Sequence, residues 1–382
     1  MAFPPVVETG RRRILLVAGE ASGDLHGGYL VRELQRQRPG IEVAAVGGDH
    51  LRACGSDILA DVRLLSAVGL VEIVGSLRRH HRVMELLKHQ MDHQRPDVVV
   101  LVDYPGFNLF VAKEAKKRGI PVFFYIAPQV WAWGKGRAKK MERLIDRLAV
   151  IFPFEEAIFN SHGRNFARYV GHPLVDELHV SGTRDEIRHR HGLSLDQPLL
   201  ALMPGSRRAE VRLLLPAMVQ AAQQLKADGW QVVLLRASTI DRSYLEQVLG
   251  DQPLPVPLID GDAYNLLHAA DAGVIASGTA TLEAALLGCP HVILYSFSWL
   301  TYLIAKMVIG QRMIGLPNVV LGRQLFPELV QRDVSAANIV RSVRQISADR
   351  VLFDQAMQDL QATMGAPGAS QRAAQELVGL IP

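Results

Sequence analysis

The 382-residue sequence contains only two cysteines, Cys54 and Cys289. A disulfide framework and a four-thiolate zinc site both need more thiols, so we expect a protein of a reducing compartment, with the cytoplasm as the default. Aromatic residues are also few, at 6% of the chain, and they do not interleave with the basic clusters. Stacking on single-stranded nucleic acid is therefore disfavoured, and we expect no nucleic-acid partner.

Long hydrophobic runs are missing as well. Only residues 14–18 are apolar between Arg13 and Gly19, which is too short for the apolar region of a secretory signal, so we expect no export. The most apolar later stretch, residues 297–309, is interrupted by Lys306, whereas a membrane-spanning helix needs about 20 apolar residues. That stretch can lie on a membrane or inside a core but cannot cross a bilayer.

Acidic residues are outnumbered by basic ones in the first part of the chain but not in the second. Residues 1–170 carry 25 Lys and Arg against 18 Asp and Glu, whereas residues 171–382 carry 17 against 20. A basic N-terminal half attracts anionic partners such as a phosphorylated substrate or the inner leaflet of a membrane. Ordinary solvated surface charge explains the imbalance equally well.

Short apolar runs, separated by helix-like segments, recur along the whole chain. Those of the first half are 14–18, 43–46, 98–102, 122–126 and 148–152, and those of the second half are 199–203, 232–235, 273–276 and 292–295. Runs rich in Val, Ile and Leu are typical of strands buried on both faces, and helices between them imply parallel crossover units. The sequence therefore predicts an α/β protein with two parallel sheets.

Proline, glycine and charged residues replace the apolar periodicity between Gly171 and Pro198, which indicates a linker. We expect an N-terminal domain at residues 1–175, a C-terminal domain at 190–345 and a helical segment at 346–382. Open parallel sheets bind ligands at the carboxyl ends of their strands, so we expect the chemistry in a cleft between the two domains.

Three turns that follow strands of the first domain carry polar or aromatic residues. The turn from Gly19 to Asp24 can approach a polar ligand closely, although its glycine spacing does not fit the dinucleotide motif, and Asp24 as a plain helix cap is the alternative. Asp103 follows the strand at 98–102, where a carboxylate can be a general base for a substrate hydroxyl or can cap the next helix. Trp131 and Trp133 can form an apolar wall or pack within a loop.

Two turns of the second domain favour phosphate binding. Gly205 and Ser206 lead into Arg207 and a helix start, where the helix dipole favours a pyrophosphate and a guanidinium can bind two phosphate oxygens. Residues 277–279 begin another helix after a strand, and Glu283 in its first turn can accept both ribose hydroxyls. A simple capping arrangement is the alternative for this second turn.

Taken together, these motifs resemble those of the lipid-A-disaccharide synthase family, inverting glycosyltransferases with the two-domain GT-B fold. The segments that carry the resemblance are GEASGD at 19–24, DYPGFN at 103–108, PQVWAW at 128–133, PFE at 153–155, VGHP at 170–173, PGSR with Glu210 at 204–210, SGTATLE at 277–283 and LPN at 316–318. One position departs from the pattern, because Gly106 stands where many relatives carry a second Asp.

The resemblance implies the joining of UDP-2,3-diacylglucosamine to 2,3-diacylglucosamine 1-phosphate through a β-1,6 bond, with release of UDP. It implies that Asp103 and Arg207 are catalytic. The implied UDP-sugar site comprises Gly205, Ser206, Arg207, Glu210, Ser277, Gly278, Thr279, Glu283 and Asn318. The acceptor side comprises Glu20, Ser22, Gly23, Asp24, Gln129, Trp131 and Trp133. No metal or other cofactor is expected, since no Asp-x-Asp element or His/Cys cluster sits where a metal site would be.

A diacylated substrate needs an apolar surface, and apolar residues from 68 to 91 follow helical spacing with basic residues beside them. The predicted lipid or membrane surface comprises Val68, Leu70, Ile73, Val74, Leu77, Arg78, Arg79 and Arg82. On spacing alone, the stripe can equally pack on its own domain. The resemblance favours lipid contact and peripheral association with the inner face of the cytoplasmic membrane, and it suggests a homodimer with exchanged C-terminal segments.

Two other functions are compatible with two α/β domains. A UDP-N-acetylglucosamine 2-epimerase-like isomerase has the same architecture but has no use for a basic apolar surface. A two-domain solute-binding protein closes on its ligand without chemistry, but such proteins are normally exported.

Overall fold

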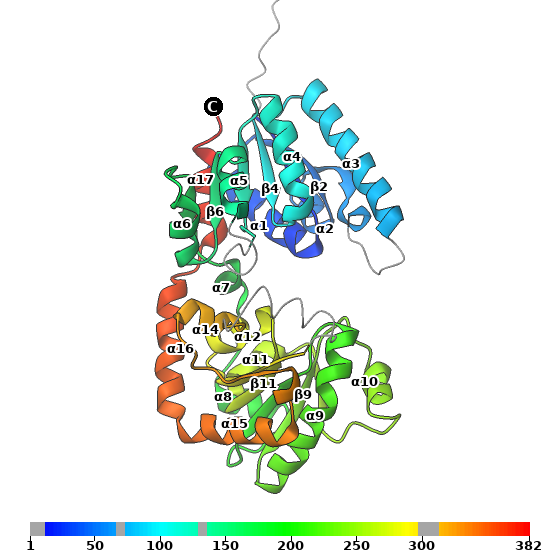
Figure 1. Ribbon diagram of the computed structural model, residues 1–382, viewed down its shortest axis with the longest axis vertical. Helices are drawn as coiled ribbons and strands as arrows, with labels where there is room; N and C mark the ends of the chain where they lie inside the picture. Colours follow the sequence, from blue (N-terminus) through cyan, green and yellow to red (C-terminus); the bar gives the residue numbers. More distant parts are fainter. Residues whose placement is uncertain (1–11, 66–72, 129–135, 297–312) are drawn as a thin grey trace, which may run out of the picture. The chain divides into compact units, whose positions relative to one another are not determined.

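The computed structural model describes residues 12–65, 73–128, 136–296 and 313–382. It divides into two compact units (Figure 1). Unit 1 comprises Met1–Pro173 together with Ala366–Pro382, and unit 2 comprises Leu174–Gly365. The C-terminal helical segment thus divides between the two units, and its last helix belongs to unit 1.

Unit 1 is built on a seven-stranded sheet in which every strand pair is parallel. Its strands, in sheet order, are β3 (Asp57–Asp61), β2 (Glu42–Gly47), β1 (Arg13–Ala18), β4 (Val98–Val102), β5 (Val122–Tyr125), β6 (Arg147–Val150) and β7 (Ala167–Tyr169). Its helices are α1 (Ala21–Gln37), α2 (Asp49–Ala53), α3 (Ile73–His93), α4 (Pro105–Lys117), α5 (Gly136–Leu144), α6 (Pro153–Asn160) and α17 (Ala369–Val378), with a 3₁₀ turn at Val62–Leu64.

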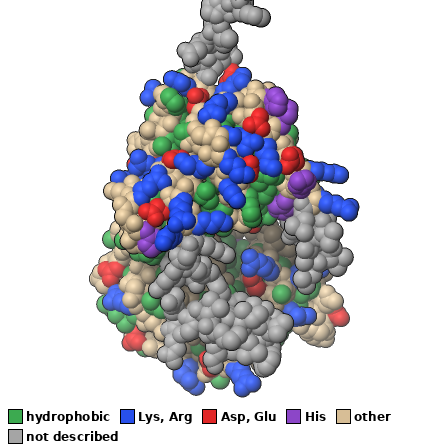
Figure 2. All heavy atoms as spheres, turned by 45° about the horizontal axis from the view of Figure 1, so that its top comes forward, with side chains coloured by type: hydrophobic (Ala, Val, Ile, Leu, Met, Phe, Trp, Pro, Cys, Tyr) green, Lys and Arg blue, Asp and Glu red, His purple; other side chains and the backbone are tan. Residues whose placement is uncertain are grey.

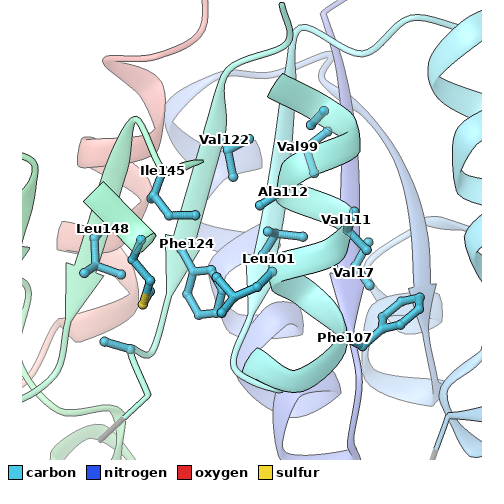
Figure 3. Packing of buried hydrophobic residues seen from close by; sticks show 14 of the residues in the cluster. Val17, Val99, Leu101, Phe107, Val111, Ala112, Val122, Phe124, Ile145 and Leu148 are labelled. Carbon is cyan, nitrogen blue, oxygen red and sulfur yellow. The ribbon is translucent and has the colours of Figure 1, made fainter. Parts of the chain in front are cut away.

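The central strands of unit 1 are apolar because helices cover both faces of the sheet. All five residues of β4 are buried. One core layer joins β1, β4, β5 and β6 to α3, α4 and α5, and Figure 3 shows its side chains, including Val111 and Ala112 of α4 and Leu101 of β4. Burial of each Val or Leu contributes about 1.5–3 kcal/mol. The packing of this layer therefore fixes the position of the junction between β4 and α4.

The last helix completes unit 1 from the far end of the chain. Helix α17 packs against α1 and β6 (Figure 1). Arg372 on α17 donates through Nε to the Val170 carbonyl at 2.7 Å, and through its Nη atoms to the carbonyls of Ala366 and Pro367 at 2.9 Å. One guanidinium therefore ties together the two stretches of chain that lead out of and back into unit 1.

Unit 2 has a six-stranded sheet, also parallel throughout. Its strands, in sheet order, are β10 (Leu258–Asp260), β9 (Gln231–Arg236), β8 (Leu199–Met203), β11 (Ala272–Ala276), β12 (His291–Tyr295) and β13 (Glu328–Val330). Its helices are α7 (Pro173–Glu177, with Pro173 in unit 1), α8 (Arg184–Arg190), α9 (Arg208–Ala227), α10 (Arg242–Val248), α11 (Ala263–Ala269), α12 (Thr279–Leu286), α14 (Leu316–Leu321), α15 (Ala336–Ala348) and α16 (Arg350–Met364), with a 3₁₀ turn at Gln331–Asp333.

The surface of unit 1 is rich in cations, in line with the charge count. Figure 2 turns the upper part of Figure 1 forward and shows many Lys and Arg side chains on it. Among the described residues, no helix combines the length and the apolar character needed to cross a bilayer.

Candidate active site

Each sheet winds in two directions from its middle. The strand order reverses between β1 and β4 in unit 1 and between β8 and β11 in unit 2. Ligands of open parallel sheets bind at the carboxyl ends of the strands at such a reversal. The motifs at 19–24 and 103–108 follow β1 and β4 and run into α1 and α4, and those at 204–208 and 277–279 follow β8 and β11 and lead into α9 and α12. The predicted motifs therefore lie at the carboxyl edge of their own sheet.

Asp103 begins the turn after β4 in an unusual backbone conformation. Asp103 and Tyr104 have φ values of +49° and +47°, a left-handed region in which residues other than glycine cost about 1–3 kcal/mol. The Asp103 N–H donates to the Tyr125 carbonyl at 2.9 Å. The fully buried Asn108 donates from Nδ2 to the carbonyls of Asp103, at 2.7 Å, and Val102, at 3.2 Å. Buried hydrogen bonds thus hold a strained turn that presents one carboxylate.

The environment of Asp103 makes its carboxylate more basic than usual. Burial raises the pKa of Asp103, the backbone N–H of Tyr104 lowers it, and the nearby charge of Glu20 raises it. A carboxylate with a raised pKa is a stronger base when it is ionised, which suits proton abstraction from a hydroxyl.

Two histidines that the sequence analysis did not assign to the site lie within electrostatic reach of this edge. His26 on α1 lowers the pKa of Asp103 slightly. Burial, with a smaller contribution from His26, lowers the pKa of His172 to about 3, so His172 is neutral near pH 7. Its ring centroid lies 5.1 Å from that of Phe152. His26 has a weak signal in the sequence, since it lies one helical turn after Ser22.

The remaining predicted acceptor-side residues of α1 differ in their surroundings. Glu20 and Ser22 are exposed, and Gly23 lies against the Val102 carbonyl. Asp24 is buried, and its carboxylate accepts from the backbone N–H groups of residues 48, 50 and 51 at 2.6, 3.0 and 3.2 Å. These bonds hold the start of α2, so the structure gives Asp24 a structural role, and its contact with an acceptor stays a prediction.

In unit 2, the turn after β8 is organised by Glu210. Its Oε2 accepts from the N–H groups of Ser206 and Arg207, both at 3.3 Å, and its Oε1 accepts from Arg207 Nη1 at 2.9 Å. Gly205 has a φ of +117°, and a Cβ there would lie 2.6 Å from Glu210 Oε2. The Arg207 side chain is 81% exposed at the N-terminus of α9. Gly205 and the Glu210 carboxylate therefore hold the Arg207 guanidinium beside the N-terminus of α9.

Tyr295, at the carboxyl end of β12, is a third residue that the sequence analysis did not assign to the site. Burial raises its pKa, Glu210 raises it further and Arg207 lowers it, so the phenol lies within electrostatic reach of the turn after β8. The signal in the sequence is its place as the first polar side chain after Val292, Ile293 and Leu294.

The turn after β11 places a second helix start and a carboxyl group at the same edge. The Ser277 N–H donates to the Leu294 carbonyl at 2.7 Å, and Gly278 precedes α12, which begins at Thr279. Burial, and then the charge of Glu177, raises the pKa of Glu283 to about 7. Glu283 is thus poised to gain or lose a proton near neutral pH.

Asn318 is placed by α14 but is fully occupied within unit 2. It is 0% exposed, and its Nδ2 donates to the Phe326 carbonyl and to Glu328 Oε1, both at 2.8 Å. Its Oδ1 accepts from the N–H groups of Leu325 and Phe326, both at 2.9 Å. These bonds shape the loop after α14, and direct contact with a nucleotide stays a prediction.

Several residues of the predicted site lie outside the part of the chain that the structure describes. Gln129, Trp131, Trp133, Val68 and Leu70 lie outside the described residues, as do the side chains of Ile73, Val74 and Leu77. Farther along α3, Arg78 and Arg82 are exposed and Arg79 is half-buried, while Leu87 and Met91 belong to the core. The later part of the stripe therefore packs on its own domain. Among the described residues, no group of three or more His, Cys, Asp or Glu side chains could hold a metal ion.

Comparisons with known proteins identify the family. A family model for lipid-A-disaccharide synthetase matches residues 14–375. The lipid-A-disaccharide synthase of Syntrophus aciditrophicus is 44% identical over 374 residues, which cover 96% of this chain and 97% of that protein. The corresponding protein of Myxococcus xanthus is 40% identical, over 98% of this chain and 99% of its own length.

Solved structures resemble the fold at low sequence identity. A UDP-GlcNAc 2-epimerase from Neisseria meningitidis, bound to UDP-GlcNAc, has a TM-score of 0.65 and 13% identity, covering 96% of this chain and 100% of its own. A calicheamicin glycosyltransferase has a TM-score of 0.61 and 18% identity, covering 97% and 98%. The predicted fold class, two parallel-sheet α/β domains of the GT-B type, is confirmed.

Proposed function

Because the chain belongs to the lipid-A-disaccharide synthase family of glycosyltransferases, we propose that it joins UDP-2,3-diacylglucosamine to 2,3-diacylglucosamine 1-phosphate through a β-1,6 bond. Unit 1 binds the acceptor and supplies the base, and unit 2 binds the donor. The observation that carries the proposal is Asp103 in a strained, half-buried turn at the carboxyl end of β4. The reaction is an inverting displacement without a metal cofactor.

In this proposal, the ionised Asp103 takes the proton of the acceptor 6-hydroxyl. The hydroxyl oxygen forms a bond to the anomeric carbon of the donor while the bond from that carbon to the UDP phosphate oxygen breaks. UDP leaves with the electron pair of the broken bond, and Asp103 is left protonated. Positioned general bases typically contribute about 10²–10⁴-fold in rate.

Arg207 and the N-terminus of α9 stabilise the negative charge that develops on the departing pyrophosphate. Support for this role comes from the exposure of the guanidinium and from its bond to Glu210. Residues 277–279 at the start of α12 contact a phosphate, and Glu283 accepts from the ribose hydroxyls. Glu210 positions Ser206 and Arg207 through its hydrogen bonds, and Asn318 holds the loop at 325–328.

The acyl chains of the substrates contact the predicted lipid surface, which extends from Val68 to Arg82. The cationic residues of α3 then face anionic headgroups, and the protein associates peripherally with the membrane. The proposal also includes a homodimer with exchanged C-terminal segments, for which α17 is the segment exchanged.

The test is UDP release by the purified protein from UDP-diacylglucosamine in detergent, with and without the monosaccharide 1-phosphate and with EDTA. We expect acceptor-dependent release that survives EDTA and a tetraacyl disaccharide phosphate by mass spectrometry. Asp103→Asn should lower kcat by about 10²-fold or more. Asp49→Asn, an exposed carboxylate on α2, is the matched control and should keep wild-type activity.

Two results would contradict the proposal. Near wild-type turnover of Asp103→Asn, with an unchanged pH dependence, would remove Asp103 as the base. Conversion of a UDP-sugar to its epimer, without an acceptor and without UDP release, would move the protein to the isomerase class.

A further inference from the structure

Tyr104 reaches two segments that are distant in sequence. Its hydroxyl donates to the Leu65 carbonyl at 3.2 Å and lies 3.0 Å from Nε2 of His80 on α3. A phenol has one proton to donate, so His80 Nε2 must carry a proton and donate to the Tyr104 oxygen.

The aromatic ring of Tyr104 also makes close contacts, with Gly19 and with His80. It lies directly over Gly19, where an added Cβ would overlap the ring. His80 lies stacked against the Tyr104 ring at 6.1 Å between ring centroids, and His80 also meets Phe107 edge-on at 5.3 Å. Gly19 begins the turn after β1, so one side chain connects the exits of β1 and β4 to α3.

The backbone of Tyr104 is part of the strained turn that carries Asp103. Two successive left-handed residues without glycine persist only where the surroundings hold them. Asn108 holds the Asp103 carbonyl from below, but no polar side chain among the described residues forms a hydrogen bond to the Asp103 carboxylate in the structure. The orientation of that carboxylate therefore depends on the neighbouring residue, whose side chain is anchored at three points.

We propose that Tyr104 is a positioning residue, which orients the Asp103 carboxylate for proton abstraction by fixing the turn after β4 to His80, Leu65 and Gly19. This inference rests on the proposed function of Asp103 as the base. Because His80 lies on the helix that carries Arg78 and Arg82, the same anchor links the base to the helix proposed to receive the lipid acceptor. Preorganisation of this kind acts on the chemical step more than on binding.

The first test is Tyr104→Phe, which keeps the ring over Gly19 and removes both hydrogen bonds. We expect kcat to fall about 10-fold, in line with two lost hydrogen bonds, while the acceptor KM changes less than about 2-fold. The acid limb of the kcat profile should move to lower pH, because a loosened turn exposes Asp103 to water and its pKa returns towards the ordinary value. Tyr29→Phe on α1, away from this edge, is the matched control.

A second pair of variants keeps the proposal testable if Tyr104→Phe folds poorly. His80→Leu removes the donor and should lower kcat, whereas His80→Gln supplies an amide N–H and should restore it. His93→Gln, at the exposed end of α3, is the control. Two outcomes would overturn the proposal. One is a wild-type kcat and an unchanged pH profile in Tyr104→Phe or His80→Leu. The other is a loss of activity that lower thermal stability fully explains, with the pH profile unchanged.

These results are separable from the proposed function. The wild-type product analysis and Asp103→Asn report on the reaction and the base, whereas the Tyr104 and His80 variants report on orientation alone. UDP affinity, measured by calorimetry, should be unchanged in all five variants at Tyr104, His80, Tyr29 and His93, because the proposed donor site belongs to unit 2.

Discussion

Gly205→Ala is the substitution whose consequence can be worked out most directly from the geometry of the donor site. Gly205 has a φ of +117°, and an added Cβ would lie 2.6 Å from Oε2 and 2.9 Å from Cβ of Glu210. Contacts that short force Glu210 to move or the turn to open. Either change breaks the arrangement in which Glu210 holds the N–H groups of Ser206 and Arg207.

The cost has two parts. Placing alanine in that backbone region costs about 1–3 kcal/mol of folding free energy. The Arg207–Glu210 ion pair adds less than about 1 kcal/mol, because Arg207 is largely exposed and water screens the pair. In the proposed donor site, displacement of Arg207 would remove a charge-assisted hydrogen bond to phosphate worth about 1.5–3 kcal/mol, which weakens UDP binding about 10–150-fold.

Calorimetry with UDP and denaturant unfolding measure the two parts separately. Gly250→Ala is the matched control, since Gly250 has a φ of +77° and nothing lies within 4 Å of an added Cβ. The control should lose stability through its backbone but keep wild-type UDP affinity. Unchanged UDP affinity in Gly205→Ala, with loss of stability equal to that of the control, would refute the reasoning that Glu210 positions Arg207 for phosphate.

Two further predictions concern pH. His291 is fully buried, and burial lowers its pKa from 6.5 to about 4. As the pH falls, the imidazole is therefore protonated in the unfolded chain before it is protonated in the folded protein. The free energy of unfolding should fall by up to about 3 kcal/mol as the pH drops from 6.5 to 4. In urea unfolding, His291→Phe should flatten this dependence, and an equal slope in both proteins would contradict it. Glu283, with a pKa of about 7, offers both carboxylate oxygens as full acceptors only when it is ionised, so the proposed contact with both ribose hydroxyls predicts a UDP affinity that rises between pH 6 and 8. Glu283→Gln should abolish that rise and Glu177→Gln should move it to lower pH, and a pH-independent wild-type affinity would argue against the ribose contact.

The central strands could be predicted from the sequence because burial on both faces demands apolar runs. The strands at 98–102 and 199–203 have the predicted bounds, and the other central strands differ from the predicted runs by one or two residues at an end. The edge strands β3, β7, β10 and β13 were missed. They have three to five residues and are only partly buried, so their sequences carry no long apolar run.

The position of Asp103 followed from the end of a predictable strand, but its conformation did not. The left-handed backbone depends on Asn108 and on Tyr104, whose anchors come from residues 65 and 80. Asn318 shows the same limit, because its partners lie in the loop at 325–328. A motif identifies which residues lie at the carboxyl edge of a sheet. Hydrogen-bond partners that are distant in the sequence decide which of those residues are available to bind a ligand.

The assignment of α17 to unit 1 has a consequence for the order in which the protein is made. Chains fold during synthesis from the N-terminal end, yet unit 1 needs residues 366–382, which are synthesised only after the whole of unit 2. Until then, the surfaces of α1 and β6 that receive Ala373, Ala374 and Leu377 have no cover. The first unit to be synthesised is therefore the last to be completed, and a chain stopped after residue 173 would be an unfinished fold with exposed apolar surface.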